Sequence, residues 1–344
     1  MRKMKNLKQI MIVTAIAISG FLFMACEKED EMMATPIAAE KNSAEADENI
    51  IIGELEQRSN VLDLVVENEK FEILGKALEY AGLAETVATI ENITVFAPTN
   101  EAFMEFMQEN DFRALEDIPV DVLTSVLLYH TVGETLYSRS LTDGYYASLS
   151  STTAGYPLSL YVVPSSGKIN AGTNIIDIDL RASNGVVHTI DKVLMPPTIV
   201  NHALNNPAFT VLVDAVVKAG LVETLSSDGP FTVFAPTNDA FYALFDELGF
   251  NDDIDDIPVV TLTKVLLSHV VAGNVTSDMV ESGYVQTLNE NKSIMISVTD
   301  GGVTIDEDIN VILTDVQGTN GVIHVIDGVI LPAIPTAERD YTDM

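Results

Sequence analysis

The stretch Thr94-Val-Phe-Ala-Pro-Thr-Asn100 occurs twice in this chain and returns unchanged as Thr232-Val-Phe-Ala-Pro-Thr-Asn238. The residues before the proline are typical of a strand, which the proline ends because it has no N–H to continue the ladder. Thr99 or Asn100 can then cap a helix that starts at Glu101. The stretch therefore predicts a strand, a sharp stop and a helix, in two copies.

Two other segments are also repeated. Residues 71–86 return in similar form at 209–224, and Asn184-Gly-Val-Val-His-Thr-Ile-Asp191 returns as Asn320-Gly-Val-Ile-His-Val-Ile-Asp327. The copies are 138 and 136 residues apart, which is far longer than a solenoid repeat. Each copy is therefore expected to be a whole domain.

Within each copy, helical patterns come first and strand patterns later. Asn60 and Thr198 are candidate N-caps of the first helices, and Gly82 and Gly220 are candidate stops of the second helices. The expected strands are short β-branched runs between Gly, Asn and Ser turns, at 159–163, 186–190, 293–299, 303–305 and 322–326. This order predicts the α+β fold class, with domains of about 140 residues that each bury a core.

Composition along the chain suggests five segments. The connector between the two domains, Met195-Pro-Pro-Thr198, is short, and its paired prolines make it stiff. The segments are a signal peptide at 1–25, an acidic flexible tether at 26–52, domain 1 at 53–197, domain 2 at 198–335 and a polar tail at 336–344.

The N-terminal segment predicts export and lipid attachment. A basic start precedes an apolar run that is shorter than a membrane span, and its end, Leu22-Phe-Met-Ala-Cys26, resembles the lipobox of bacterial lipoproteins. The resemblance implies that Cys26 carries the lipid, although a cysteine can also lie by chance beside an ordinary cleavage site. The acidic stretch 27–31 resembles that of surface-exported Bacteroidota lipoproteins. We therefore expect an outer-membrane lipoprotein of the cell envelope, exposed at the surface.

The charge of the chain excludes some partners. The formal net charge is −33, and removal of residues 1–25 makes it −37. Nucleic-acid binding relies on Lys and Arg that neutralise phosphates, so no nucleic-acid partner is expected. For the same reason the membrane is expected to be contacted through the lipid anchor only. A solvated acidic surface that keeps the protein soluble explains the charge equally well.

Three ordered segments carry a family resemblance. The box Thr94–Pro98, the segment Leu127-Leu-Tyr-His-Thr-Val132 and the box Asn184-Gly-Val-Val-His188 occur in this order in both copies. Together they resemble the fasciclin (FAS1) domain over residues 53–335. The resemblance implies a β-wedge sandwich wrapped by helices, with a role in adhesion or extracellular recognition. Ser268 stands where the family often has tyrosine, as at Tyr129.

The resemblance also suggests candidate partner-binding residues. In animal FAS1 adhesion proteins a short acidic–aliphatic segment before the second box is implicated in integrin recognition. The matching residues here are Asp179 with Leu180, and Asp315 with Val316. Each aspartate could bridge to a cationic group while its aliphatic neighbour fills a pocket. The alternative is a strand-edge aspartate before a turn, with its apolar neighbour in the core.

Three other groups of residues could take part in binding. His130, His269, His188 and His324 repeat between the copies, but without metal-ligand spacing they are expected to be hydrogen-bonded core histidines. The acid run at 251–256 could hold calcium or be a solvated loop. Tyrosines that could form a sugar-stacking platform or simply pack are Tyr145, Tyr146, Tyr156 and Tyr161. No catalytic residues, metal or cofactor are expected.

These observations lead to one expected function and two alternatives. We expect a surface-anchored adhesion or recognition lipoprotein, not an enzyme, that binds an extracellular protein or polysaccharide through its tandem domains. The first alternative is a structural or uptake-complex accessory protein facing the periplasm. The second is a hydrolase of surface polymers, since abundant carboxylates could pair in space.

Overall fold

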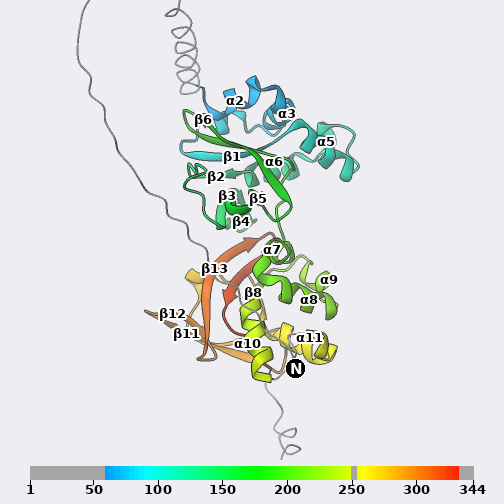
Figure 1. Cartoon of the computed structure of the whole chain (residues 1–344), viewed down its shortest axis with the longest axis vertical. Helices are drawn as coiled ribbons and strands as arrows, with labels where there is room; N and C mark the ends of the chain where they lie inside the picture. The colour runs from blue at the N-terminus through cyan, green and yellow to red at the C-terminus, as the bar shows by residue number, and fades with distance from the viewer. Residues whose placement is uncertain (1–58, 249–253, 333–344) are drawn as a thin grey trace, which may run out of the picture. The chain divides into compact units, whose positions relative to one another are not determined.

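A computed structural model describes residues 59–248 and 254–332 of the chain (Figure 1). The predicted signal peptide and tether, Cys26 and the polar tail lie outside the described residues, as do the first three residues of the acid run. Within the described ranges, no helix is both long enough and apolar enough to cross a bilayer.

Domain 1 places its helices mostly before its strands, as the sequence predicts. Its helices are α2 (Val61–Glu67), α3 (Glu72–Tyr80), α4 (Ala84–Thr89), α5 (Asn100–Glu109) and α6 (Val120–Tyr129). Its strands are β1 (Ile93–Pro98), β2 (Thr131–Val132), β3 (Gly144–Ser151), β4 (Pro157–Val163), β5 (Lys168–Ile169), β6 (Thr173–Ala182) and β7 (Gly185–Ile190).

Domain 2 repeats this order. Its helices are α7 (Ile199–Asn205), α8 (Thr210–Lys218), α9 (Val222–Leu225), α10 (Asn238–Leu248) and α11 (Val259–Ser268). Its strands are β8 (Phe231–Pro236), β9 (Val270–Ala272), β10 (Gly283–Gln286), β11 (Ser293–Thr299), β12 (Gly302–Ile305), β13 (Ile309–Gly318) and β14 (Gly321–Ile326). The α+β class is confirmed in both domains.

The strands follow the same neighbour order in both domains. In domain 1 the seven strands form a closed barrel in which β1 runs parallel to β7 and β2 reaches β3 through the pair Val132↔Ser148. In domain 2 the corresponding order runs β9-β8-β14-β13-β12-β11-β10, and β8 again pairs in parallel with β14. The sheet of domain 2 has open ends at β9 and β10.

The repeated strand divides each domain into two cores. In β1, Val95 and Ala97 pack into a core beneath the helices, whereas Phe96 points into the barrel. Figure 1 shows α2, α3 and α5 grouped on one side of β1 and β6. In β8, Ala235 likewise packs into the core beneath the helices of domain 2, and Phe234 packs into the second core of that domain. Because successive side chains alternate between faces, a strand with cores on both sides is largely apolar, and in β1 and β8 one buried threonine is the exception.

Local capping follows the sequence. The side chains of Asn60 and Thr198 cap α2 and α7, each in a reciprocal capping box. Thr99 caps α5 by accepting a hydrogen bond from Ala102 N. Gly82 and Gly220 follow the second helices in the left-handed conformation, with φ of 69° in both cases. These positions favour glycine because a Cβ is strained there.

The two domains belong to one compact unit. The connector is held in place, because Pro197 O accepts a hydrogen bond from Thr319 N at 2.8 Å. Gln317 N in β13 donates to Ser159 Oγ in β4 at 2.9 Å. The ring of Tyr145 packs against the helix-side core of domain 2. The paired prolines therefore act together with specific contacts between β4 and β13.

Candidate functional site

Each domain has an irregularity in its long strand at the predicted aspartate. The pairing of β6 with β7 shifts between Ile175 and Asp177 and again between Asp177 and Leu180. That of β13 with β14 shifts between Val311 and Leu313 and again between Leu313 and Val316, so the second shift in each strand contains the aspartate. Asp179 and Asp315 lie at these bulges in the left-handed conformation, with φ of 59° and 62°. A bulge adds one residue, so it reverses which face the following side chains occupy.

The bulge directs the predicted aliphatic neighbours inward. Leu180 is partly buried against the helix-side core of domain 1, and Val316 is 1% exposed in the corresponding core of domain 2. This is the alternative arrangement that the sequence left open, with a strand-edge aspartate and its apolar neighbour in the core. Partner contact by Asp179 or Asp315 remains a prediction.

The carboxylate of each aspartate fixes a loop. Asp179 accepts hydrogen bonds from Ser138 N at 2.7 Å and Ser138 Oγ at 2.5 Å. Asp315 accepts from Ser277 N at 2.8 Å and also from Ser277 Oγ. Partial burial opposes ionisation of Asp179, but the Ser138 hydrogen bonds and nearby His188 and Arg181 outweigh it and lower the pKa of Asp179 below its ordinary value.

The four repeated histidines lie in hydrogen-bonded core positions, as expected. His130 Nε2 accepts from Leu194 N at 2.9 Å, so its Nδ1 carries the proton and donates to Val126 O at 2.7 Å. His269 repeats this arrangement with Ile330 N and Val265 O. Burial lowers the pKa of both rings to about 4, which keeps them neutral.

The second histidine pair contacts the neighbouring loop, and His188 also joins it to the bulge. His188 Nδ1 lies 3.3 Å from the N–H of Asp179, and its Nε2 lies 2.8 Å from Leu136 O. His324 Nε2 lies 2.9 Å from Val275 O, and burial lowers the pKa of both rings. Within residues 59–248 and 254–332, no group of three or more His, Cys, Asp or Glu side chains could hold a metal ion.

The serine that departs from the family pattern has its own partner. Tyr129 Oη donates to Ser159 O at 2.9 Å and accepts from Asn170 Nδ2 at 3.0 Å. In domain 2 the shorter Ser268 Oγ accepts from Asn289 Nδ2 at 2.9 Å. An asparagine therefore reaches the buried hydroxyl in both domains, which explains why the fold tolerates Ser268.

The exposed aliphatic residues of the long strands precede the aspartate and lie in the same irregular stretch. Their exposed fractions are 50% for Ile176 and 57% for Ile178 in β6, and 56% for Ile312 and 43% for Leu313 in β13. The sequence did not point to these four residues, because the candidates came from the family resemblance, which indicates only the aspartate and the residue after it. The positive φ that breaks the alternation has no strong sequence signal, although aspartate adopts it more readily than most residues do.

Three of the four predicted tyrosines line one cleft of about 460 Å³. Tyr145, Tyr146 and Tyr156 of domain 1 face Asp278 and Asp315 of domain 2 across it. The cleft thus joins two sets of candidate residues that lie far apart in the sequence.

Tyr145 also has a packing role. Its ring lies 4.7 Å from that of Tyr161 and 5.7 Å from that of His202, and its hydroxyl accepts a hydrogen bond from Asn206 Nδ2 at 3.1 Å. Burial raises the pKa of Tyr145 above its ordinary value. Packing therefore accounts for Tyr145, and in part for Tyr146, whose ring lies against the barrel core of domain 1.

Similar proteins were found by sequence and by structure. One domain is 48% identical over 139 residues to Protein sll1483 of Synechocystis, which covers 39% of this chain and 73% of that protein. Transforming growth factor-beta-induced protein ig-h3 of Sus scrofa is 30% identical over 264 residues, covering 73% of this chain but only 35% of that longer protein. The FAS1 domain pair of the insect cell adhesion molecule Fasciclin I aligns with a TM-score of 0.47 at 19% identity, covering 77% of this chain and 98% of that pair.

The family match covers most of the chain. The fasciclin domain matches twice, at residues 69–196 and 207–332. These ranges contain the strand–proline–helix unit, the Tyr-His or Ser-His segment and the Asn-Gly box of each copy. The chain therefore belongs to the fasciclin domain family, with two domains in tandem.

Proposed function

We propose that this protein is a surface-displayed recognition lipoprotein that binds an extracellular protein or polysaccharide through both fasciclin domains. The lipid on Cys26 anchors it to the outer membrane, and the domains carry no catalytic activity. Membership of the fasciclin family supports adhesion as the general role, because fasciclin domains occur in adhesion proteins such as insect Fasciclin I.

The observation that carries the proposal is a duplicated strand surface. Ile176 precedes the bulge aspartate in β6, and Ile312 occupies the matching position in β13. Both side chains are about half exposed, and a part-exposed aspartate follows three residues later in the same strand. Exposed aliphatic groups on one strand with a fixed polar group are typical of recognition surfaces.

The presence of this strand surface in both domains strengthens binding to a partner that both can reach. Two similar sites that reach one ligand array bind with an avidity above either single affinity, because the second contact forms within the same complex. The contacts between β4 and β13 favour this by limiting the freedom of one domain relative to the other.

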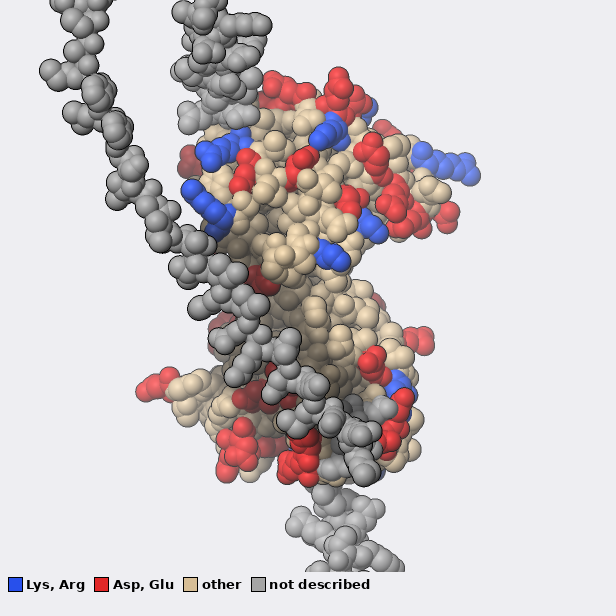
Figure 2. All heavy atoms as spheres, viewed as in Figure 1, with Lys and Arg blue, Asp and Glu red and all other residues tan. Residues whose placement is uncertain are grey.

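Charge narrows the class of partner. Residues 198–332 contain three lysines and no arginine, and Lys218 and Lys292 are in ion pairs with Asp255 and Asp306. Figure 2 shows acidic side chains spread over the elements of both domains. A partner with basic groups, or one bridged by cations, fits this surface better than a phosphate-rich polymer.

Surface exposure is tested by protease treatment of intact cells that express the full chain, with a periplasmic protein as the internal control. The proposal expects digestion of this protein while the control survives. Protection until the outer membrane is breached would instead favour the accessory role facing the periplasm. A Cys26→Ser variant should leave the membrane fraction if that residue carries the lipid.

Binding is tested with the same cells on a panel of immobilised matrix proteins and polysaccharides. The variant Ile176→Ser with Ile312→Ser should lose most adhesion, and each single variant should lose less. Val298→Ser, which replaces an exposed aliphatic residue on β11, is the matched control. Equal adhesion of the double variant and the control would show that these strands are not the binding surface.

A further inference from the structure

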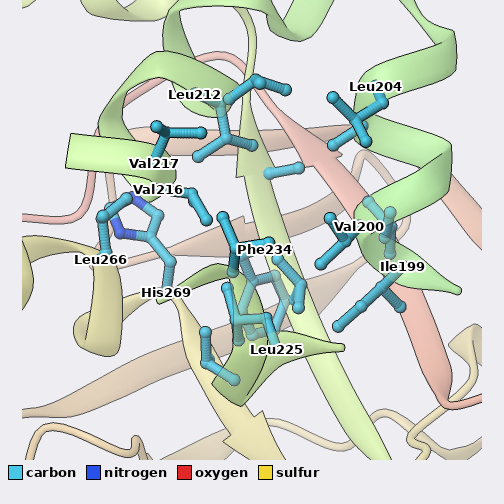
Figure 3. Close-up of a pocket in the computed structure, with 17 residues that line it drawn as sticks. Ile199, Val200, Leu204, Leu212, Val216, Val217, Leu225, Phe234, Leu266 and His269 are labelled. Atoms are coloured by element: carbon cyan, nitrogen blue, oxygen red, sulfur yellow. The ribbon is translucent and has the colours of Figure 1, made fainter. Parts of the chain in front are cut away.

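Domain 2 contains an apolar cavity that the proposed adhesive role does not use. The cavity has a volume of about 240 Å³ and lies between helices α7, α8, α9 and α11 and strands β8 and β14. In Figure 3, Leu204, Leu212, Val216, Phe234 and Leu225 surround this space. Its floor reaches the buried strand residue Ala235.

The walls offer no free polar group. Among the described residues that line the cavity, His269 has the one polar side chain, and both of its ring nitrogens are engaged by Val265 O and Ile330 N. A peptide main chain that entered would lose its hydrogen bonds to water without replacement, at a large free-energy cost. A hydrocarbon chain needs no such bonds, and apolar cavities of about 150 Å³ already stay dry and bind benzene or xenon.

The repeat points to two wall positions where domain 2 has a smaller residue than domain 1. Ala203 and Val216 line the cavity, and the matching positions of domain 1, 138 residues earlier, are Val65 and Leu78. Val65 is 0% exposed and Leu78 is 5% exposed, so the larger side chains are packed inside the same helical framework. At these two wall positions domain 2 therefore has the smaller residue, although domain 1 shows that the same fold accommodates a larger one.

The mouth of the cavity differs between the domains as well. Leu204, Val217 and Val222 line it and remain exposed, with Val217 at 60%. The residues that match Val217 and Val222 in domain 1 are Glu79 and Ala84. An apolar rim around an apolar cavity gives a hydrocarbon chain a continuous path from the surface to the floor.

We propose that this cavity binds one alkyl chain of a neutral or zwitterionic amphiphile, such as a lipid acyl chain. The chain inserts between α7 and α8, and the head group stays outside the rim. The net charge of −33 opposes an anionic head group, which is why the neutral and zwitterionic classes are favoured. This site is independent of the strand surface proposed for adhesion.

The test titrates the full chain with 1-octanol and follows the methyl NMR resonances of its Leu and Val residues. In the wild-type protein, saturable changes in chemical shift should be confined to the methyl groups that line the cavity. Ala203→Val with Val216→Leu, which installs the residues of domain 1, should weaken binding about tenfold or more by filling the space. Ala84→Val, which makes a similar change in domain 1, should bind like wild type.

A second variant guards against a folding defect. Val217→Glu changes an exposed rim residue to its domain 1 counterpart, so it should fold normally and still weaken binding. Lysophosphatidylcholine with a ten-carbon acyl chain should compete with 1-octanol better than decanoate does, because the two chains are equal in length and its head group carries no net charge. The proposal is wrong if wild type shows no saturable shifts, if the filled variant binds 1-octanol as tightly as wild type, or if decanoate competes better.

Discussion

The side chain of Asn184 accepts a hydrogen bond from the backbone N–H of Val61, 123 residues earlier, at 2.8 Å. The same asparagine donates to Val87 O and Ile90 O, at the end of α4. Asn320 repeats the arrangement in domain 2, where it accepts from Ile199 N and donates to Leu225 O. The asparagine of the repeated Asn-Gly box therefore connects the first helix, the third helix and the sheet of each domain.

Replacing this asparagine should strongly destabilise its domain. Asn184→Ala leaves one donor and two acceptors without their partner, and we expect a loss of about 2–4 kcal/mol in the free energy of unfolding. Denaturant titration measures this loss, and Asn320→Ala should behave alike in domain 2. Asn291→Ala, at an exposed position, is the control. If Asn184→Ala is as stable as Asn291→Ala, the side-chain hydrogen bonds of Asn184 do not stabilise the domain.

The glycine after this asparagine is required by a close approach of two strands. A Cβ on Gly185 would lie 2.0 Å from Ile93 O, and one on Gly321 would lie 2.2 Å from Phe231 O. Gly185→Ala should therefore push β7 away from β1 and cost about 3 kcal/mol or more. Gly144→Ala has open space around the added methyl group and should cost far less. Thermal unfolding of the two variants compares them directly, and equal midpoints would contradict the argument.

Buried histidines should make the protein sensitive to mild acid. Burial lowers the pKa of His130, His202 and His269 to about 4, from an ordinary value near 6.5. Below pH 6.5 the unfolded chain binds protons that the folded chain does not, so stability is full above that pH and falls as the pH drops toward 4. Urea unfolding at several pH values between 7.5 and 4.5, a range of about 3 units, measures how steeply the free energy of unfolding depends on pH.

A variant with one histidine fewer provides the comparison. His202→Leu removes a titrating ring and should give a shallower dependence of unfolding free energy on pH, whatever its stability at pH 7.5. The slope is the informative quantity, because the substitution also removes the hydrogen bond to Gln317 O. An unchanged slope would mean that protonation of this histidine does not oppose folding.

Tyr145 should couple the unfolding of the two domains. Its ring belongs to domain 1 but packs against the helix-side core of domain 2 and bonds to Asn206. Tyr145→Ala should lower the free energy of unfolding by about 3 kcal/mol. It should also split a single calorimetric transition into two, because the packing of this ring against domain 2 is lost. Tyr284→Ala, at a position 80% exposed, should leave the transition intact. A single unshifted transition in Tyr145→Ala would rule out this coupling.

Local features of the fold were predictable from sequence because they depend on neighbouring residues. The caps at Asn60, Thr198 and Thr99 act within one helical turn, and the observed β11 matches the predicted run 293–299. The repeated boxes also indicated two fasciclin domains, which the family match confirms. The aspartates of the candidate site could be located in the same way, from their spacing before the Asn-Gly box.

The orientation of the site residues and the cavity depended on contacts between distant segments. The family resemblance suggested Leu180 and Val316 as partner contacts or, alternatively, as core residues. Bulges at the two aspartates turn them toward the cores, and Ile176 and Ile312 are exposed instead. The cavity next to Ala203 arises where α7, α8 and the sheet meet. The sequence by itself determined the family, the repeat and the local caps, because these are written in short segments. The tertiary structure decided which side chains reach solvent, because packing of remote elements sets the strand register and the space left between them.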